Sequence, residues 1–280
     1  MEEHSKPVFK IDIENVLQSK APKYYKKIPR FVINYLKRII HQDDINGIIV
    51  RNNRLDGVDF MQALVTDEFD LKLCVEGEEN IPKEGRFVFA SNHPLGGLDG
   101  ICLSACIGEK FDKKIKCLVN DVLLNIKNLE SIFVPVNKYG SQAKNSTRAI
   151  NEAYASDNQI ITFPAGLCSR KIGGKIIDLP WHKNFVVKAM EYRRDIIPVY
   201  FEGRNSNFFY NLSRLRKKVG IKFNFELVYL PDELFKNKGK TFRIIFGEPI
   251  PWQSLDKSET PLQQAKRIKE QVYTLKKERR

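Results

Sequence analysis

The sequence predicts an α/β fold in which helices flank a mixed, largely parallel central sheet, preceded by a basic helical extension. Three observations lead to this prediction. From residue 71 onward, short runs rich in β-branched and aromatic residues alternate with stretches of helical periodicity, as in α/β sheets. Residues 1–70 instead contain a basic segment with helical spacing. The 280 residues and 42% hydrophobic content suffice for a substantial core. We therefore expect a helical region at 1–70 and a main domain at 71–280.

The first predicted element is an amphipathic helix that starts near Pro29, a residue suited to the first helical turn. Its apolar residues recur at helical spacing and are Ile28, Phe31, Val32, Tyr35, Leu36, Ile39 and Ile40. No acidic residue occurs at positions 16–42. Such a helix either packs on the protein with a solvated basic face or lies among lipid headgroups. The candidate membrane-docking residues are Lys26, Lys27, Arg30, Phe31, Lys37 and Arg38.

The main domain is predicted to contain alternating strands and helices. The expected strands are Leu71–Val75, Arg86–Ala90, Ile115–Val119, Ile132–Val136, Gln159–Phe163, Ile196–Phe201, Phe223–Tyr229 and Phe242–Phe246. The expected helices are Asp99–Gly108, Gln142–Tyr154, His182–Arg193 and a final helix with Thr260 as N-cap and an apolar stripe up to Leu275.

The composition limits the partners and the kinds of binding site that this protein can have. The formal net charge of +13 implies an acidic partner, such as nucleic acid, an anionic membrane or a phosphorylated small molecule. Five Cys without C-x-x-C spacing and four scattered His give no metal site, and their sparse number suits a reducing compartment. The first residues are acidic and polar, unlike a signal peptide. No stretch approaches the ~20 apolar residues of a membrane span. Any membrane contact is therefore expected to be peripheral.

One candidate catalytic pair follows a predicted buried strand. His93 comes directly after the strand Arg86–Ala90 and Ser91-Asn92, and the Gly96-Gly97 turn leads to Asp99. Open α/β sheets bind ligands at the carboxyl ends of their strands. The two glycines allow Asp99 to reach back to the imidazole, where a carboxylate fixes the tautomer and stabilises the protonated form. This pattern predicts a His–Asp general base, although Asp99 as a helix cap beside a structural His93 remains an alternative.

Two further strand ends carry polar residues. The strand at 159–163 runs into Pro164-Ala165-Gly166, and the cations Arg170 and Lys171 follow. The strand at 132–136 runs into Asn137-Lys138. Cations at these positions suit a phosphate or a carboxylate, unless they are simply solvated turn residues. Three such strand ends suggest one shared cleft.

These blocks together resemble a known family. Asn92-His93 with Asp99, Phe133–Lys138, Phe163-Pro164-x-Gly166 and Ile197-Pro198-Val199 resemble, in order, the four motif blocks of 1-acylglycerol-3-phosphate acyltransferase-like enzymes. The resemblance covers roughly residues 71–250, and the ordered set is much more specific than any single block. The stretch Phe163–Lys171 and the basic N-terminal region are most similar to the hemolysin-like branch. That branch includes acyltransferases that make ornithine and glycine lipids.

The resemblance implies a mechanism and partners. His93, oriented by Asp99, would deprotonate a lysolipid hydroxyl. The hydroxyl would attack the thioester of acyl carrier protein or acyl-CoA without an acyl-enzyme intermediate, metal or cofactor. Backbone N–H groups at Gly96, Gly97 or Gly166 are candidate oxyanion donors. The implied substrate-binding residues are Asn92, Gly96, Gly97, Asn137, Lys138, Gly166, Ser169, Arg170 and Lys171. The enzyme would act peripherally at the cytoplasmic face of the cell membrane, on an anionic surface.

The sequence departs from the family pattern in ways that bear on the substrate. Five residues separate His93 from Asp99, where the family has four. Ala165 and Leu167 stand where the third block has Glu and Thr, and Asn137-Lys138 replaces Asp-Arg in the second block. The acceptor is therefore expected to be lysophosphatidic acid or a lyso-amino-acid lipid, whose carboxylate Arg170 or Lys171 could bind.

Three other function classes are compatible with parts of the sequence. A lipid or thioester hydrolase would need a nucleophile such as Cys168 or Ser169, but no G-x-S-x-G elbow is present. A nucleic-acid binder could use the aromatic residues interleaved with the N-terminal cations, but no nucleic-acid motif follows and no such partner is expected. A catalytically inactive membrane-binding scaffold remains open because of the departures at Ala165 and Leu167.

Overall fold

The computed structural model describes residues 10–20, 22–120, 126–136, 142–255 and 258–276. Its centre is a seven-stranded sheet with the order β1-β9-β8-β2-β5-β3-β4. All neighbouring strands are parallel except β8 and β9, so the predicted mixed, largely parallel sheet is confirmed. The strands are β1 (Lys72–Glu76), β2 (Phe87–Ser91), β3 (Ile115–Val119), β4 (Phe133–Pro135), β5 (Gln159–Thr162), β8 (Asp195–Glu202) and β9 (Thr241–Phe246).

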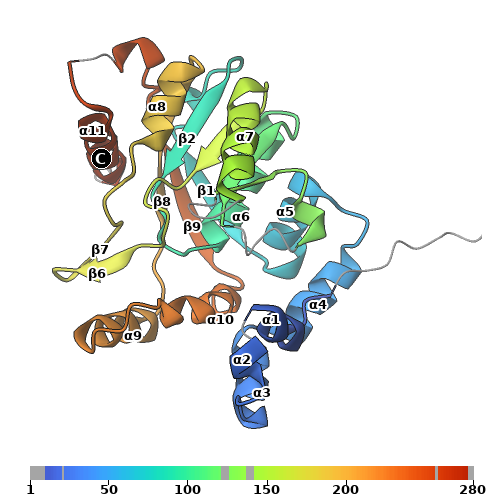
Figure 1. Cartoon of the computed structure of the whole chain (residues 1–280). Coiled ribbons are helices and arrows are strands. Elements are labelled where there is room, and N and C mark those ends of the chain that lie inside the picture. Colours follow the sequence, from blue (N-terminus) through green and yellow to red (C-terminus); the bar gives the residue numbers. More distant parts are fainter. Residues whose placement is uncertain (1–9, 21, 121–125, 137–141, 256–257, 277–280) are drawn as a thin grey trace, which may run out of the picture.

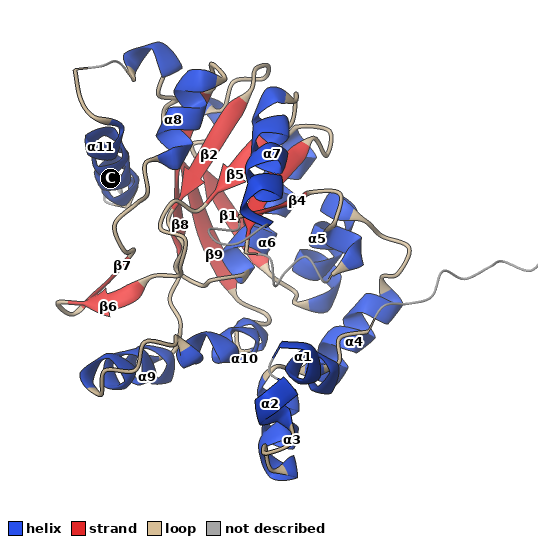
Figure 2. Cartoon of the chain, in the orientation of Figure 1, coloured by secondary structure: helices blue, strands red, loops and turns tan. Residues whose placement is uncertain are grey.

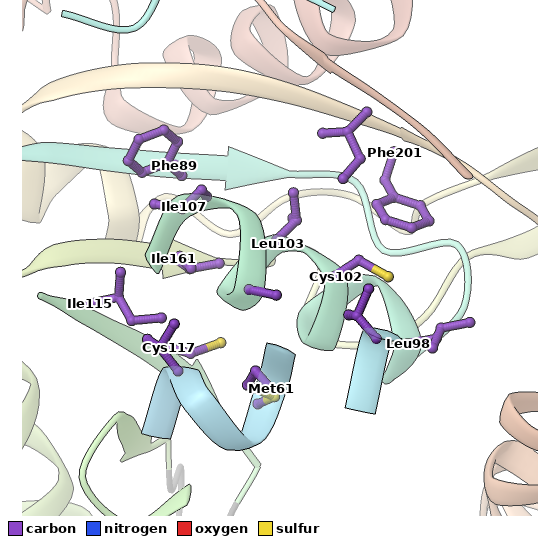
Figure 3. Packing of buried hydrophobic residues seen from close by; sticks show 14 of the residues in the cluster. Met61, Phe89, Leu98, Cys102, Leu103, Ile107, Ile115, Cys117, Ile161 and Phe201 are labelled. Carbon is purple, nitrogen blue, oxygen red and sulfur yellow. The ribbon is translucent and has the colours of Figure 1, made fainter. Parts of the chain in front are cut away.

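Helices cover both faces of the sheet (Figures 1 and 2). One face packs against α5 (Gly57–Ala63), the π-helical turn η1 (Leu64–Glu68) and α6 (Leu98–Lys110). Figure 3 shows α6 side chains, including Leu103 and Ile107, among sheet residues such as Phe89 and near Met61 of α5. The other face packs against α7 (Gln142–Ala155), α8 (Asn184–Glu191) and α11 (Pro261–Leu275). Strand residues alternate between the two cores, as the pleat requires.

The final helix begins as predicted. Thr260 is the N-cap, with its hydroxyl accepting the N–H of Gln263 while the Gln263 side chain accepts the N–H of Thr260. This capping box, followed by Pro261, fixes the start of α11. Short additional turns are η2 (Glu78–Asn80), η4 (Lys127–Leu129) and η6 (Trp252–Ser254).

One predicted strand is wrong. Residues 223–229 form a bend followed by a 3₁₀ turn, η5 (Phe225–Tyr229), which leads into α10 (Leu230–Phe235). The sequence also gave no indication of α9 (Asn207–Lys218) or of the small antiparallel hairpin β6 (Arg170–Ile172) and β7 (Lys175–Ile177). Phe223 is 71% exposed, so its β-forming side chain is not buried in any sheet.

The N-terminal region contains α1 (Ile13–Lys20), α2 (Pro22–Tyr25), α3 (Arg30–Ile39) and α4 (Gln42–Arg51). On α3, Ile33 and Ile39 are buried, whereas Phe31 is 73% and Tyr35 is 40% exposed. The predicted apolar stripe is therefore only partly covered by the protein. The division at residue 70 remains a prediction. Residues of α5 and η1 belong to the same hydrophobic core as the sheet.

Candidate active site

The loop after β2 forms the centre of the candidate site. β2 lies between β5 and β8 and is parallel to both, so the loops that follow these three strands meet at one edge of the sheet. Asn92 fixes the start of the loop through the oxygen and the nitrogen of its side-chain amide. Its Oδ1 accepts the N–H of Phe201 at 2.7 Å, and its Nδ2 donates to the Phe201 carbonyl at 2.9 Å. Asn92 is 3% exposed, so its amide acts between two strands rather than toward a ligand.

His93 and Asp99 lie within hydrogen-bond distance despite the extra residue between them. His93 Nδ1 is 3.0 Å from Asp99 Oδ2. Gly96 accommodates the longer loop because it adopts φ +79°, a conformation that favours glycine. A Cβ at Gly96 would also stand 3.0 Å from Cys168 Cβ, so the loop leaves little space for a side chain there. The five-residue spacing therefore preserves the predicted pairing.

Asp99 is held as a buried carboxylate. It is fully buried and lies in the first turn of α6. The N–H groups of Leu95, Gly97 and Gly100 donate to it at 3.0, 3.1 and 3.0 Å. Burial disfavours the charged form, but His93 and these backbone donors outweigh it and lower the pKa of Asp99. The carboxylate therefore remains ionised beside the imidazole.

The surroundings of His93 favour its protonated form. Its burial lowers the pKa, but the charge and hydrogen bond of Asp99 and the charge of Asp178 outweigh it, so the pKa of His93 is raised above 6.5. Arg170 opposes this shift. The ring of Phe163 stacks on the imidazole with centroids 4.2 Å apart and an interplanar angle of 29°. The imidazole is thus fixed in orientation and retains 16% side-chain exposure.

Asp178 is a site residue that the sequence analysis missed. Its Oδ1 accepts the backbone N–H of His93 at 3.2 Å and the hydroxyl of Ser169 at 2.6 Å. Its Oδ2 accepts Trp181 Nε1 at 2.9 Å. Ser169 in turn donates its N–H to the His93 carbonyl at 2.7 Å. Burial raises the pKa of Asp178 above its ordinary value, and the hydrogen bonds from these donors offset only part of that shift. The backbone of His93 is therefore held on both sides by the loop after β5 and the segment after β7.

Arg170 is placed differently from the prediction. Its side chain is 4% exposed, and its guanidinium pairs with Glu226 at 3.2 Å. It also donates to the Cys168 carbonyl at 2.6 Å and lies over the ring of Phe209. Glu226 is fully buried and also pairs with Arg216 at 2.8 Å. Arg170 is therefore not a free cation for a substrate. Its neighbour Lys171 is half-buried on β6 and remains a candidate for that role.

The predicted oxyanion donors are already engaged. Gly97 N–H donates to Asp99 Oδ1, and Gly96 N–H is 3.4 Å from Asp99 Oδ2. Gly166 N–H donates to the Phe163 carbonyl at 2.9 Å in a turn where Gly166 has φ +68°. These glycines shape their loops, and their N–H groups are not directed at a reacting atom. The predicted residues Asn137 and Lys138 lie outside the described residues.

The alternative nucleophiles also have other partners. Ser169 donates its hydroxyl to Asp178 rather than to His93. Cys168 is 2% exposed, and burial raises the pKa of its thiol to about 11. A thiol with such a pKa is a poor nucleophile at neutral pH. Neither of these two described side chains is therefore an activated nucleophile beside His93.

The described residues show two further absences. No helix among them is long and apolar enough to cross a bilayer. Within the same residues, His, Cys, Asp and Glu side chains do not gather in groups of three or more that could hold a metal ion.

Comparison with known proteins identifies the family. The lyso-glycine lipid O-acyltransferase of Bacteroides thetaiotaomicron is 51% identical over 268 residues, which cover 96% of this chain and 98% of that protein. The lyso-glycine lipid O-acyltransferase of Phocaeicola vulgatus is 49% identical over 268 residues, covering 96% of each. A solved 1-acyl-sn-glycerophosphate acyltransferase from Thermotoga maritima matches with a TM-score of 0.49 and 16% identity, covering 96% of this chain and all of that one. The acyltransferase family model matches residues 15–279. The chain therefore belongs to the acyltransferase family, which confirms the resemblance predicted from its four motif blocks.

Proposed function

We propose that this enzyme transfers a fatty acyl group from an acyl-carrier-protein or acyl-CoA thioester to the hydroxyl of a lysolipid, and that the preferred acceptor is a lyso-glycine lipid. The observation that carries the proposal is the His93–Asp99 pair at the carboxyl edge of the sheet, in which His93 Nδ1 lies 3.0 Å from Asp99 Oδ2. The names of the two full-length relatives support the acceptor. The absence of the family's usual Glu and Thr at Ala165 and Leu167 is compatible with a head group other than a phosphate.

In this mechanism Asp99 holds Nδ1 of His93, so Nε2 takes the proton from the acceptor hydroxyl. The oxygen attacks the thioester carbonyl, and the imidazolium returns its proton to the departing thiolate. Lys171 is proposed to contact the anionic head of the acceptor. Gly166 and Ser169 would act by shaping the loop, and Arg170 by positioning it. The cations Lys26 and Lys27, which precede α3, and Arg30, Lys37 and Arg38 on α3 are proposed to dock the enzyme on an anionic membrane together with the exposed ring of Phe31.

The first test compares acceptors and donors in one experiment. Labelled acyl groups on acyl carrier protein and on CoA are offered with lyso-glycine lipid, lyso-ornithine lipid and lysophosphatidic acid in detergent. We expect lyso-glycine lipid to show the highest kcat/KM. Equal or faster transfer to lysophosphatidic acid would contradict the acceptor assignment. Release of free fatty acid without transfer would favour the hydrolase, and no product with any pair would favour an inactive scaffold.

Asp178 is proposed as a positioning residue for His93. Asp178→Ala removes the acceptor of the His93 N–H, and a small displacement of a catalytic group can lower a rate by about 100-fold. We expect a loss of about 10- to 100-fold in kcat with little change in KM. Asp178→Asn keeps an acceptor oxygen and is expected to recover part of the rate.

The pH profile separates this role from a purely structural one. The charge of Asp178 helps to raise the pKa of His93. Removing that charge therefore lowers this pKa, so the acid limb of kcat/KM should move to lower pH in Asp178→Asn. An unchanged acid limb, with a rate loss that follows only a lower unfolding midpoint, would contradict the positioning role.

A further inference from the structure

The segment from Gly203 to Phe225 combines basic and exposed apolar residues. It contains no acidic residue. Helix α9 occupies Asn207–Lys218 and begins at Ser206, whose hydroxyl accepts the N–H of Phe209. We define the α9 surface as the exposed residues of this helix and of the loop that follows it. Its apolar members are Phe208, Leu215, Val219, Ile221 and Phe223, and its cations are Arg214, Lys217, Lys218 and Lys222.

The apolar members are strongly exposed. Phe223 is 71%, Val219 58% and Leu215 56% exposed. Single exposed apolar residues are common on protein surfaces, but a concentrated group indicates an interaction site. Here the apolar side chains alternate with cations along one short stretch. That combination is typical of segments that insert apolar side chains at the headgroup boundary while cations bind anionic lipids.

The opposite face of α9 is firmly held by the catalytic domain. Arg216 is buried in its ion pair with Glu226, and Tyr210 accepts the N–H of Asn205 at 3.0 Å. Phe209 is fully buried beneath the guanidinium of Arg170. The α9 surface is thus the outer side of a helix whose inner side packs on strand β6, which begins at Arg170. Its orientation relative to His93 is fixed by these contacts.

The α9 surface also joins the exposed part of α3. Tyr35 of α3 and Tyr229 share a hydrogen bond of 2.9 Å between their hydroxyls. The ring of Tyr229 contacts Phe208 at a centroid distance of 5.0 Å. Tyr35, Arg38 and Phe208 also line one shallow hollow. Figures 1 and 2 show α3, α9 and α10 at the same end of the molecule, below the sheet.

We propose that the α9 surface is a second membrane-docking element, which contacts the same anionic phospholipid bilayer as α3. The proposal rests on the proposed function, since a lysolipid acceptor resides in that bilayer. Two helices that contact the bilayer together fix the orientation of a peripheral enzyme, whereas one amphipathic helix leaves it free to tilt. The carboxyl edge of β2 and β8 is directed toward α9 (Figure 2), so this docking turns the His93 side of the sheet toward the membrane.

The test measures vesicle binding of the full-length enzyme. The apolar variant is Val219→Ser with Phe223→Ser, and the charge variant is Lys217→Gln, Lys218→Gln and Lys222→Gln. Leu262→Ser is the matched control, because Leu262 is 57% exposed on α11, outside the α9 surface. Each protein is sedimented with vesicles of phosphatidylcholine, with or without phosphatidylglycerol, at low and high salt. Thermal unfolding of each variant should match that of the wild type.

We expect the control to bind as the wild type does. The apolar variant should bind at least about 10-fold more weakly at both salt concentrations, because buried apolar area contributes directly to interfacial binding. The charge variant should lose binding only to anionic vesicles and mainly at low salt. Wild-type binding by the apolar variant would overturn the proposal. So would unchanged vesicle binding together with a raised KM for acyl carrier protein, which would assign the surface to the donor protein.

Acyl transfer in detergent separates this proposal from the proposed function. All three variants should retain wild-type transfer to a detergent-dispersed acceptor, because none of their residues belongs to the candidate active site. A wild-type enzyme that transfers to no acceptor but binds vesicles through the α9 surface would refute the proposed function and support the docking surface. If the wild-type enzyme transfers acyl groups but its apolar variant still binds vesicles normally, the proposed function is supported and the docking surface is refuted.

Discussion

His93→Ala is expected to lower kcat/KM for acyl transfer by at least about 100-fold. General-base catalysis contributes about 10²- to 10⁴-fold, and among the described residues no second imidazole lies beside Asp99. The measurement is the initial rate of transfer to a detergent-dispersed acceptor, together with the unfolding midpoint. His41→Asn is the matched control, since His41 also pairs with carboxylates but lies between Asp44 and Asp232 near α10. Asn tolerates the φ of 56° at this position.

The pH dependence provides an independent check on the same base. The pKa of His93 is raised above 6.5, and a general base must be unprotonated. kcat/KM should therefore increase as the pH rises through the raised pKa of His93, and it should be low at any pH below that pKa. Asp99→Asn removes the charge that raises the pKa, so the residual activity should have its acid limb at lower pH. A profile that stays flat through neutral pH, or a His93→Ala enzyme with wild-type activity, would exclude His93 as the base.

Local sequence patterns predicted most of the sheet because each central strand is a short buried run. β2 and β5 are buried on both faces, and their apolar residues stand out from the polar loops around them. The same reasoning failed at residues 223–229. Phe223 and Phe225 have high β-propensity, but β-propensity depends on a partner surface, and β8 already pairs with β2 and β9. β8, the strand that precedes this segment in the chain, therefore has no free edge with which the segment could pair.

The candidate site was predictable only where its partners are close in sequence. His93 and Asp99 belong to one loop, so their spacing and the two glycines indicated the pair. Asp178 reaches the His93 N–H from 85 positions away, and no pattern around it differs from an ordinary strand end. Arg170 was predicted to bind a ligand because its true partner is also distant in the sequence. Its partner Glu226 is 56 positions away and carries no local signal.

Glu226→Ala is expected to destabilise the protein by about 3–5 kcal/mol, because it leaves two buried guanidinium groups without their shared carboxylate. Glu226 is fully buried, and the side chains of Arg170 and Arg216 are 4% and 7% exposed. The measurement is the free energy of unfolding from denaturant titration. Glu152→Ala is the matched control, since its pair with Arg148 is exposed and such pairs contribute only about 0–1 kcal/mol. A change below about 1 kcal/mol in Glu226→Ala would contradict the buried network.

A triple variant then separates the structural role of Arg170 from substrate binding. Apolar replacements of similar volume can restore the stability that is lost when one partner of a buried ionic triad is removed. We therefore expect Arg170→Met, Arg216→Met and Glu226→Met together to be more stable than Glu226→Ala alone. If Arg170 acts by positioning its loop, this variant should keep its KM for the acceptor, while Lys171→Met should raise it. If the triple variant is stable but has a raised KM for the acceptor, while Lys171→Met has an unchanged KM, the anion-binding role belongs to Arg170 instead.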